Sequence, residues 1–270
     1  MTDFSETLIG RSGYTGEAFT RTYDRFRPAP PPALLRILKH LALAEHPKLV
    51  VDLGAGTGLS TRAWTDAAER IVGIEPNEAM LAEARKATRS RNIEYLRGFA
   101  SETGLPDGAA DIVTCAQAFH WMEPQPVLQE AARLLRAGGV FAAYDYDVPP
   151  IVRPEVDDAF AAHFDARRAA RTRLGLEAGA ATWPKEQHLE QIRSSGCFRF
   201  AREAVCHSPG EIDADGLVGL AESIGGPREI FGDAAPEVTQ TFERLRALAR
   251  RTLQRPHAIV ICYRIRAGIK

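Results

Sequence analysis

The stretch VVDLGAGTGLS, Val50 to Ser60, decides the fold of this chain. An apolar run predicts a buried strand over 48–53, and the residues after the glycines predict a helix over 59–68. Gly54, Gly56 and Gly58 connect the two. Three glycines in five residues at a strand-to-helix junction let a bound molecule approach the backbone closely. The stretch therefore predicts a cofactor site at a strand–loop–helix unit.

Strands and helices alternate around this unit. Apolar runs predict strands at 70–75, 92–98, 110–117 and 140–147. Helical spacing of apolar residues predicts helices at 33–44 after a proline-rich turn, at 77–88 with Asn77 as its cap, and at 126–139 ending at Gly138 and Gly139. Such alternation predicts a doubly wound α/β fold, with a mostly parallel sheet covered by helices on both faces.

After about residue 147 the regular alternation of predicted strands and helices ends. Residues 154–195 are predicted helical, followed by a strand at 198–208, a helix at 238–254 and a strand at 257–265. We expect four parts: an N-terminal segment and helix (1–48), the cofactor-binding core (49–147), a helical lid inserted between strands five and six (148–197), and C-terminal strands that complete the sheet (198–270). The lid is expected to cover the carboxyl edge of the sheet.

Composition excludes several classes of function. The formal net charge of the 270 residues is -1, so bulk electrostatics favour neither nucleic acid nor an anionic membrane as a partner. The four cysteines are far apart, and the histidines lack metal-binding spacing, so no metal site is expected. The first residues predict no secretory leader, and no apolar run approaches the roughly 20 residues of a membrane span. A cytoplasmic protein is expected.

Two carboxylates indicate the type of cofactor. The loop reads GxGxG, and Leu59 stands where a dinucleotide fingerprint has its third glycine. Asp52 precedes the loop, where a carboxylate would repel a pyrophosphate and attract an ammonium group. Glu75 ends the second strand and suits ribose hydroxyl groups, in a nicotinamide cofactor as well as in others. A ligand with an ammonium group, a ribose and no phosphate fits this pattern, and S-adenosylmethionine is one.

Several motifs together resemble a known family. VVDLGAGTGLST, IVGIEPNEAML and GLPDGAADIVTCAQAFHW resemble the motifs of class I S-adenosylmethionine-dependent methyltransferases. YDRFRPAPPPALL is similar to the N-terminal segment of the small-molecule, type 11 branch that includes trans-aconitate methyltransferase-like proteins. The resemblance covers most of the chain. It implies a seven-stranded sheet with one antiparallel strand, and methyl transfer from S-adenosylmethionine.

The resemblance also implies cofactor-binding residues. The methionine half of the cofactor would contact Asp52, Gly54, Gly56 and Gly58, and its carboxylate would pair with Arg27. Glu75 would bind the ribose, and Gln117 would lie near the sulfonium. The adenine would lie beside Asn77, Met80, Ala100 and Ser101. The segment that contains Tyr23 would fold over the cofactor and contribute to the substrate site. Ser101 departs from the pattern, because many relatives carry an acid there that meets the adenine amino group.

Residues at the ends of the fourth and fifth strands are candidates for the acceptor site. Phe119 and Trp121 provide aromatic faces that stabilise a sulfonium, and His120 between them is a candidate general base or a simple hydrogen-bonding residue. Tyr144 and Asp145 end the fifth strand at the same edge. Asp145 either orients His120, holds a substrate amine, or only starts a turn.

The main hypothesis is therefore an enzyme that transfers a methyl group from S-adenosylmethionine to a small molecule, in line with the sulfur, giving S-adenosylhomocysteine. The alternatives are a nicotinamide-dependent oxidoreductase and an S-adenosylmethionine-binding protein with other chemistry or none. The acceptor atom, the oligomeric state and the roles of the arginine clusters at 167–173 and 244–255 are left open by the residues.

Overall fold

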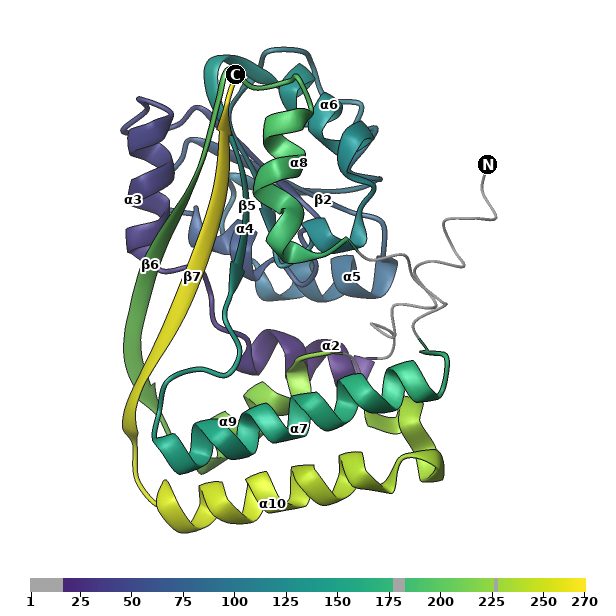
Figure 1. Ribbon diagram of the computed structural model, residues 1–270. Helices are drawn as coiled ribbons and strands as arrows, with labels where there is room; N and C mark the ends of the chain where they lie inside the picture. Colours follow the sequence, from purple (N-terminus) through teal and green to yellow (C-terminus); the bar gives the residue numbers. More distant parts are fainter. Residues whose placement is uncertain (1–16, 177–182, 226–227) are drawn as a thin grey trace. The chain divides into compact units, whose positions relative to one another are not determined.

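The chain contains a mixed sheet and several helices (Figure 1), in a computed structural model that describes residues 17–176, 183–225 and 228–270. In the described residues the sheet has seven strands in the order β3-β2-β1-β4-β5-β7-β6. The strands are β1 (Leu49–Leu53), β2 (Arg70–Glu75), β3 (Ile93–Arg97), β4 (Ala110–Ala116), β5 (Leu135–Tyr146), β6 (Phe200–Ile212) and β7 (His257–Ile269). Strands β1 to β5 are parallel, and β7 is antiparallel to β5, so the predicted fold class is confirmed.

Helices connect these strands and follow β5. The α-helices are α2 (Glu17–Phe26), α3 (Pro32–Leu41), α4 (Leu59–Ala63), α5 (Glu78–Ala87), α6 (Pro124–Leu134), α7 (Pro154–Arg173), α8 (His188–Ser194), α9 (Ala214–Ser223) and α10 (Pro236–Thr252). Short 3₁₀ helices are η1 (Phe119–Trp121), η3 (Lys185–Gln187) and η4 (Arg228–Ala234). Within the described chain, none of these helices is long and apolar enough to cross a bilayer.

The chain divides into two compact units. One unit, called the sheet unit here, comprises residues 28–146, 182–207 and 263–270; the other, the helical unit, comprises residues 1–27, 147–181 and 208–262. These units cut across the four-part division expected from the sequence. The helical insert after β5 is shared between them, because α7 belongs to the helical unit whereas η3 and α8 belong to the sheet unit.

The sheet unit has helices on both faces of its strands (Figure 1), with α3 on one side and α6 and α8 on the other. All five residues of β1 are buried, and β1 pairs with β2 on one side and β4 on the other. The chain therefore moves outward from β1 in two opposite directions. In parallel sheets, ligands bind outside the carboxyl ends of the strands at such a switch point. The glycine loop follows β1 there.

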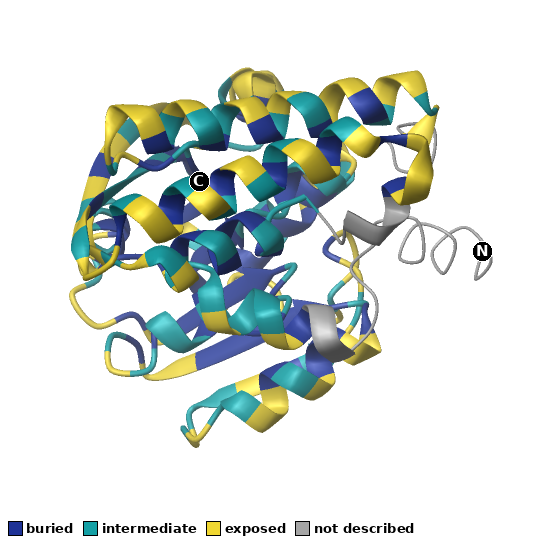
Figure 2. Cartoon of the chain, turned by 90° about the horizontal axis from the view of Figure 1, so that it is seen from below, coloured by how far each residue is buried: buried dark blue, intermediate teal, exposed yellow. Residues whose placement is uncertain are grey.

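Each unit has its own apolar core. In the sheet unit the core is formed by residues of β1, β2, β4 and β5 with α6, including Val51, Val113 and Leu128. In the helical unit, α7, α9 and α10 pack through residues such as Phe160 and Phe242. Figure 2 shows the central strands mostly dark blue and the helices with blue, teal and yellow residues in alternation, as expected for amphipathic helices.

Three sequence predictions need correction. Gly138 and Gly139 do not end a helix: α6 ends at Leu134 and β5 starts at Leu135. The strand register shifts between Ala110 and Ile112, and the backbone of Asp111 approaches Gly139 so closely that a Cβ there would lie 3.1 Å from its carbonyl oxygen. The two glycines therefore lie in an irregular part of β5, where Gly139 lets the backbone of β4 approach closely. Helix α3 ends at Leu41, earlier than predicted, and α9 was not predicted, although Asp213 caps it.

Candidate functional site

The glycine loop after β1 is held by backbone hydrogen bonds. The amides of Gly54 and Ala55 both donate to the carbonyl oxygen of Ile74 in β2, and the Gly58 amide donates to Ala55. Gly54, Gly56 and Gly58 have φ values of 72°, 57° and 83°, in the left-handed region that favours glycine. The loop therefore reverses the chain tightly and directs it into α4, with Gly58 at the N-cap.

The three glycines differ in what surrounds them. A Cβ on Gly54 would lie 2.7 Å from Ala118 and Met122, and one on Gly58 would lie 2.2 Å from the Tyr95 hydroxyl. Among the residues that the structure describes, a Cβ on Gly56 would meet no atom within 4 Å. Gly54 and Gly58 are thus required by packing, whereas Gly56 faces open space. The backbone at Gly56 is the part of the loop that a ligand can approach.

Glu75 closes this space from the end of β2. Its Oε2 accepts a hydrogen bond of 2.9 Å from the Gly56 amide, and its Oε1 accepts one of 2.9 Å from the Asn77 amide. Burial raises the pKa of the carboxyl group, and these two hydrogen bonds act in the opposite direction. Each carboxylate oxygen has a further lone pair, so Glu75 retains capacity to accept hydroxyl donors of a ligand.

Asp52 lies beneath the loop with no exposed surface. Thr114 and Ser60 donate to its Oδ1 at 2.7 Å and 3.4 Å, and Thr61 donates to its Oδ2 at 2.7 Å. Burial raises the pKa of Asp52 to about 6, although the three hydroxyl groups lower it. In this arrangement Asp52 fixes the start of α4, and its direct ion pair with a cofactor ammonium group stays a prediction.

Tyr144 belongs to the same buried layer. Its side chain is 1% exposed, and its hydroxyl group lies 2.5 Å from Ser60 Oγ. Burial raises the pKa of Tyr144 well above its ordinary value. The hydroxyl is used inside the protein, so the structure gives Tyr144 a supporting place under the loop. The contact with a substrate predicted from the sequence stays a prediction.

The residues expected near an adenine lie along β2–α5 and after β3. Asn77 caps α5, as predicted: its Oδ1 accepts from the amides of Ala79 and Met80. Met80 and Ala100 are buried, and Ser101 is exposed. Their contact with adenine is untested and stays a prediction.

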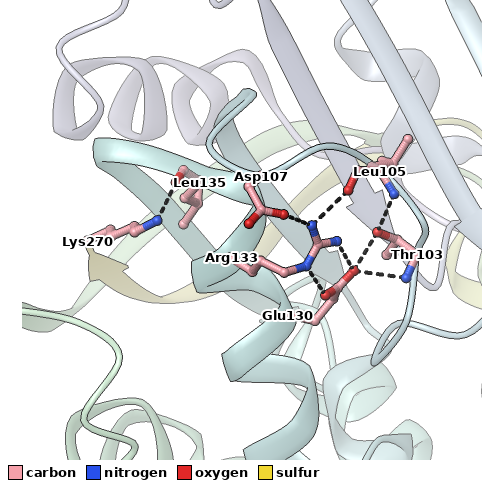
Figure 3. A network of polar contacts seen from close by, with 7 residues as sticks. All are labelled: Thr103, Leu105, Asp107, Glu130, Arg133, Leu135 and Lys270. Atoms are coloured by element: carbon pink, nitrogen blue, oxygen red, sulfur yellow. Dashed lines mark hydrogen bonds and ion pairs between the residues drawn. The ribbon is translucent and has the colours of Figure 1, made fainter.

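A polar network anchors the chain that follows Ser101 (Figure 3). Glu130 of α6 accepts hydrogen bonds from the amide and hydroxyl of Thr103 and pairs with Arg133, which also binds Asp107 and the carbonyl oxygen of Leu105. Burial alone would raise the pKa of Glu130, but the hydrogen bonds from Arg133 and Thr103 lower it to about 2. The network fixes residues 103–107 to α6.

The FHW turn forms η1 after β4. Phe119 is 1% exposed, and its ring packs edge-on against Phe141 (centroids 5.6 Å apart) and His188 (4.9 Å). Phe119 thus packs in the core of the sheet unit, and its predicted contact with a ligand stays a prediction. His120 and Trp121 are half-buried neighbours with ring centroids 5.2 Å apart. These two remain candidates for contact with a ligand.

Gln117 has an unusual backbone at the end of β4. Its φ of 52° is in the left-handed region, which is uncommon for a residue other than glycine and typical of functional sites. Lys185 donates a hydrogen bond of 3.1 Å to its Oε1. Because an ammonium group only donates, this bond fixes the orientation of the side-chain amide. Among the described residues, the buried Nε2 of Gln117 has no hydrogen-bond partner, so it can donate to a ligand.

Asp145 is surrounded by basic side chains. Lys185 Nζ lies 2.7 Å and His120 Nδ1 3.8 Å from its Oδ1; Arg266 Nη1 lies 3.4 Å and His188 Nδ1 3.8 Å from its Oδ2. Burial acts to raise the pKa of Asp145, but the charge of Lys185 and then the other basic groups outweigh it, and the pKa lies below its ordinary value. Asp145 is therefore an ionised carboxylate next to His120, the arrangement expected if it orients that histidine.

Lys185, His188 and Arg266 were missed by sequence reasoning. No spacing rule connects the end of β5 with residues in η3, α8 and β7. The backbone amide of Trp183 donates to the carbonyl oxygen of His120 (2.9 Å), which attaches this later segment to the FHW turn. Part of the predicted lid, residues 183–194, therefore does contact the carboxyl ends of β4 and β5.

Tyr23 and Arg27 belong to the helical unit. The Arg27 guanidinium donates from Nε and Nη2 to the carbonyl oxygen of Ser223, and it lies over the Tyr23 ring, 4.5 Å from the centroid. These contacts attach α2 to the end of α9. The proposed pairing of Arg27 with a methionine carboxylate, and the role of Tyr23 in a substrate site, stay predictions.

The residues of the sheet unit fit S-adenosylmethionine. Gly56 provides backbone next to open space, the buried carboxylate of Glu75 faces this backbone, and the Gln117 amide is an orphaned donor at the end of the neighbouring strand β4. This combination suits a ligand with ribose hydroxyl groups and an oxygen-bearing end. A doubly wound sheet with this loop defines the class of nucleoside-cofactor-binding α/β proteins.

Comparisons with known proteins show a methyltransferase domain within this chain. Residues 51–143 match the family model of a methyltransferase domain. An uncharacterised methyltransferase of Mycobacterium tuberculosis is 37% identical over 117 residues, 43% of this chain and 46% of that protein. A provisionally assigned S-adenosylmethionine-dependent methyltransferase of Saccharomyces cerevisiae is 30% identical over 135 residues, 48% of this chain and 46% of that protein. The chain thus spans about half the length of the curated relatives it matches.

Solved structures of similar fold include methyltransferases. A provisionally assigned type II methyltransferase from Anaeromyxobacter dehalogenans is 28% identical, with a TM-score of 0.64 over 90% of this chain and 98% of that chain. The YcgJ protein of Bacillus subtilis is 18% identical, with a TM-score of 0.54 over 87% and 97%, and shows the fold alone. Residues 51–143 thus form a methyltransferase domain with the fold of these solved structures, and the likeness to an S-adenosylmethionine-dependent methyltransferase supports S-adenosylmethionine as the cofactor of this domain.

Proposed function

We propose that the protein transfers the methyl group of S-adenosylmethionine to a small-molecule acceptor and releases S-adenosylhomocysteine. The observation that carries the proposal is the open space at Gly56, bordered by the Glu75 carboxylate at the switch point of the sheet. When bound, the cofactor supplies an electrophilic methyl group on a sulfonium. The methyltransferase family of residues 51–143 supports this chemistry.

In this proposal the protein contributes position more than acid–base strength. Glu75 binds the ribose hydroxyl groups, and the backbone at Gly56 lies against the methionine half. Gln117 donates from its orphaned amide to an oxygen of the bound ligands. Fixing two reactants in line accounts for a large part of the rate enhancement in such a reaction.

His120 is the proposed acceptor-side base. Its Nδ1 faces the ionised Asp145 at 3.8 Å, which favours the tautomer with the proton on Nδ1 and leaves Nε2 to receive a proton from an acceptor. The half-buried Trp121 beside it is proposed to contact the acceptor. The near-zero net charge supports a small acceptor in the cytoplasm over a nucleic acid.

Calorimetric titration with S-adenosylhomocysteine and, in parallel, NAD tests the cofactor. We expect saturable binding of S-adenosylhomocysteine alone. Binding of NAD alone would favour the oxidoreductase alternative, which Leu59 in the loop already disfavours.

A second assay tests the acceptor class. The protein is incubated with a cell extract and S-adenosylmethionine that carries a deuterated methyl group, and the fractions are analysed by mass spectrometry. We expect the label in molecules below the size of proteins and RNA. Label confined to macromolecules would contradict the proposal, and binding without any label transfer would favour the non-catalytic alternative.

A further inference from the structure

Lys185 occupies a defined place at the strand ends. It begins η3, two residues after Trp183, whose amide is hydrogen-bonded to the His120 carbonyl. Its ammonium group bridges Asp145 at the end of β5 and Gln117 at the end of β4, at 2.7 Å and 3.1 Å. One residue from a later segment thus joins the two strand ends that carry the proposed acceptor-side residues.

Among the described contacts around Asp145, cations outnumber carboxylates without any contribution from histidine. Lys185 and Arg266 are cations, and Asp145 and Glu203 are the carboxylates they contact; Arg266 Nε lies 2.9 Å from Glu203 Oε2. Arg264, which is half-exposed, adds a further cation on the outer side of Glu203. The Asp145 and Arg266 side chains are each 7% exposed, so solvent screens their charges weakly.

Both histidines that face Asp145 are thereby disfavoured as cations. Each Nδ1 lies 3.8 Å from Asp145, farther away than the ammonium group of Lys185. A proton on either imidazole would add positive charge to a poorly solvated cluster in which cations already outnumber carboxylates. His188 follows this rule: burial lowers its pKa to about 4, Asp145 opposes the change, and Arg266 and Lys185 add to it.

We propose that Lys185 is a positioning residue that occupies the charge of Asp145 and so keeps His120 neutral, with Nε2 ready to accept a proton. The ammonium group takes the place that a protonated His120 would otherwise take beside the carboxylate. Without it, the two carboxylates would face Arg266 and the outer Arg264 only, and His120 would bind a proton more tightly. The inference rests on the proposed function only for the use of the neutral imidazole.

Histidine titration by NMR tests the assignment without cofactor or acceptor. The signal of His120 in the full chain is identified by its loss in His120→Gln. In Lys185→Met we expect the midpoint of this signal to rise so that His120 binds its proton at least about tenfold more tightly. Lys185→Arg, which keeps the charge, should restore the midpoint of the unaltered protein.

Matched controls separate this effect from general damage. Lys86→Met removes an exposed lysine whose partner is Glu83 and should leave the His120 midpoint unchanged. Lys185→Gln serves as the second neutral variant if Lys185→Met does not fold. An unchanged midpoint in the neutral variants, or an Arg variant that behaves like them, would overturn the inference even if S-adenosylhomocysteine still binds.

Discussion

The amide nitrogen of Gly56 lies 2.9 Å from Oε2 of Glu75, a partly buried hydrogen bond between the glycine loop after β1 and the end of β2. The other carboxylate oxygen accepts from Asn77, the cap of α5. One side chain therefore sets the geometry of the loop and of the next helix, at the point where a cofactor meets both.

Glu75→Gln tests this relationship. A glutamine amide has one acceptor atom, so its NH₂ group would face a backbone N–H of Gly56 or Asn77, and one buried donor would lose its partner. We expect a loss of stability of about 1–3 kcal/mol and at least tenfold weaker calorimetric binding of S-adenosylhomocysteine. Glu78→Gln, at an exposed position of α5, should change neither. Unaltered affinity in the Glu75 variant would remove it from the ribose site.

Gly56→Ala probes the open space directly. The added methyl group meets no atom of the described part of the chain within 4 Å, so the variant should fold with only the cost of about 1 kcal/mol for a left-handed backbone. We expect S-adenosylhomocysteine affinity to fall tenfold or more, because the methyl group occupies the space of the ligand. Gly196→Ala is the matched control, with a φ of 73° and open surroundings after α8. Equal affinities in the two variants would show that no ligand lies against Gly56.

Asp52 makes stability depend on pH near neutrality. Its folded-state pKa of about 6 lies above the ordinary 3.8, so its contribution is full below about 3.8 and is lost as the pH rises through about 6. Between these limits the free energy of unfolding should fall by roughly 3 kcal/mol relative to Asp52→Asn. Urea denaturation of both proteins from pH 4 to 7.5 measures this difference. Parallel curves would contradict the raised pKa.

Glu130 makes the stability of the protein depend on pH in the opposite direction. Its pKa of about 2 lies below the ordinary 4.5, so the stabilisation is present above 4.5 and is lost as the pH falls towards 2. Glu130→Gln should destabilise the protein by up to roughly 3 kcal/mol at pH 7, and by less at pH 4. The free energy of unfolding at the two pH values measures this. The exposed Glu102→Gln is the control; a Glu130 deficit that does not shrink on acidification would show that its charge is not the stabilising feature.

Local patterns in the sequence were sufficient for the sheet unit from β1 to β5. Buried parallel strands appear as continuous apolar runs, glycines mark the loop, and Asn77 marks a helix start, so the strand order of a doubly wound sheet could be expected. The same reasoning failed at Gly138 and Gly139, because a glycine pair is typical of helix ends, and only the register shift between β4 and β5 shows why a strand needs them.

By itself, the sequence determined the fold class and the position of the cofactor loop, because these follow from apolar runs and from glycine spacing along one strand and its loop. It offered Glu75 and His120 as candidates from their places at strand ends, and Gln117 through the resemblance to methyltransferases. The tertiary structure decided what each side chain contacts. It enclosed Phe119 in the core, surrounded Asp52 with hydroxyl groups and brought Lys185, His188 and Arg266 to Asp145. Such contacts join residues far apart in the chain, and hydrogen bonds and charges depend on distance in space.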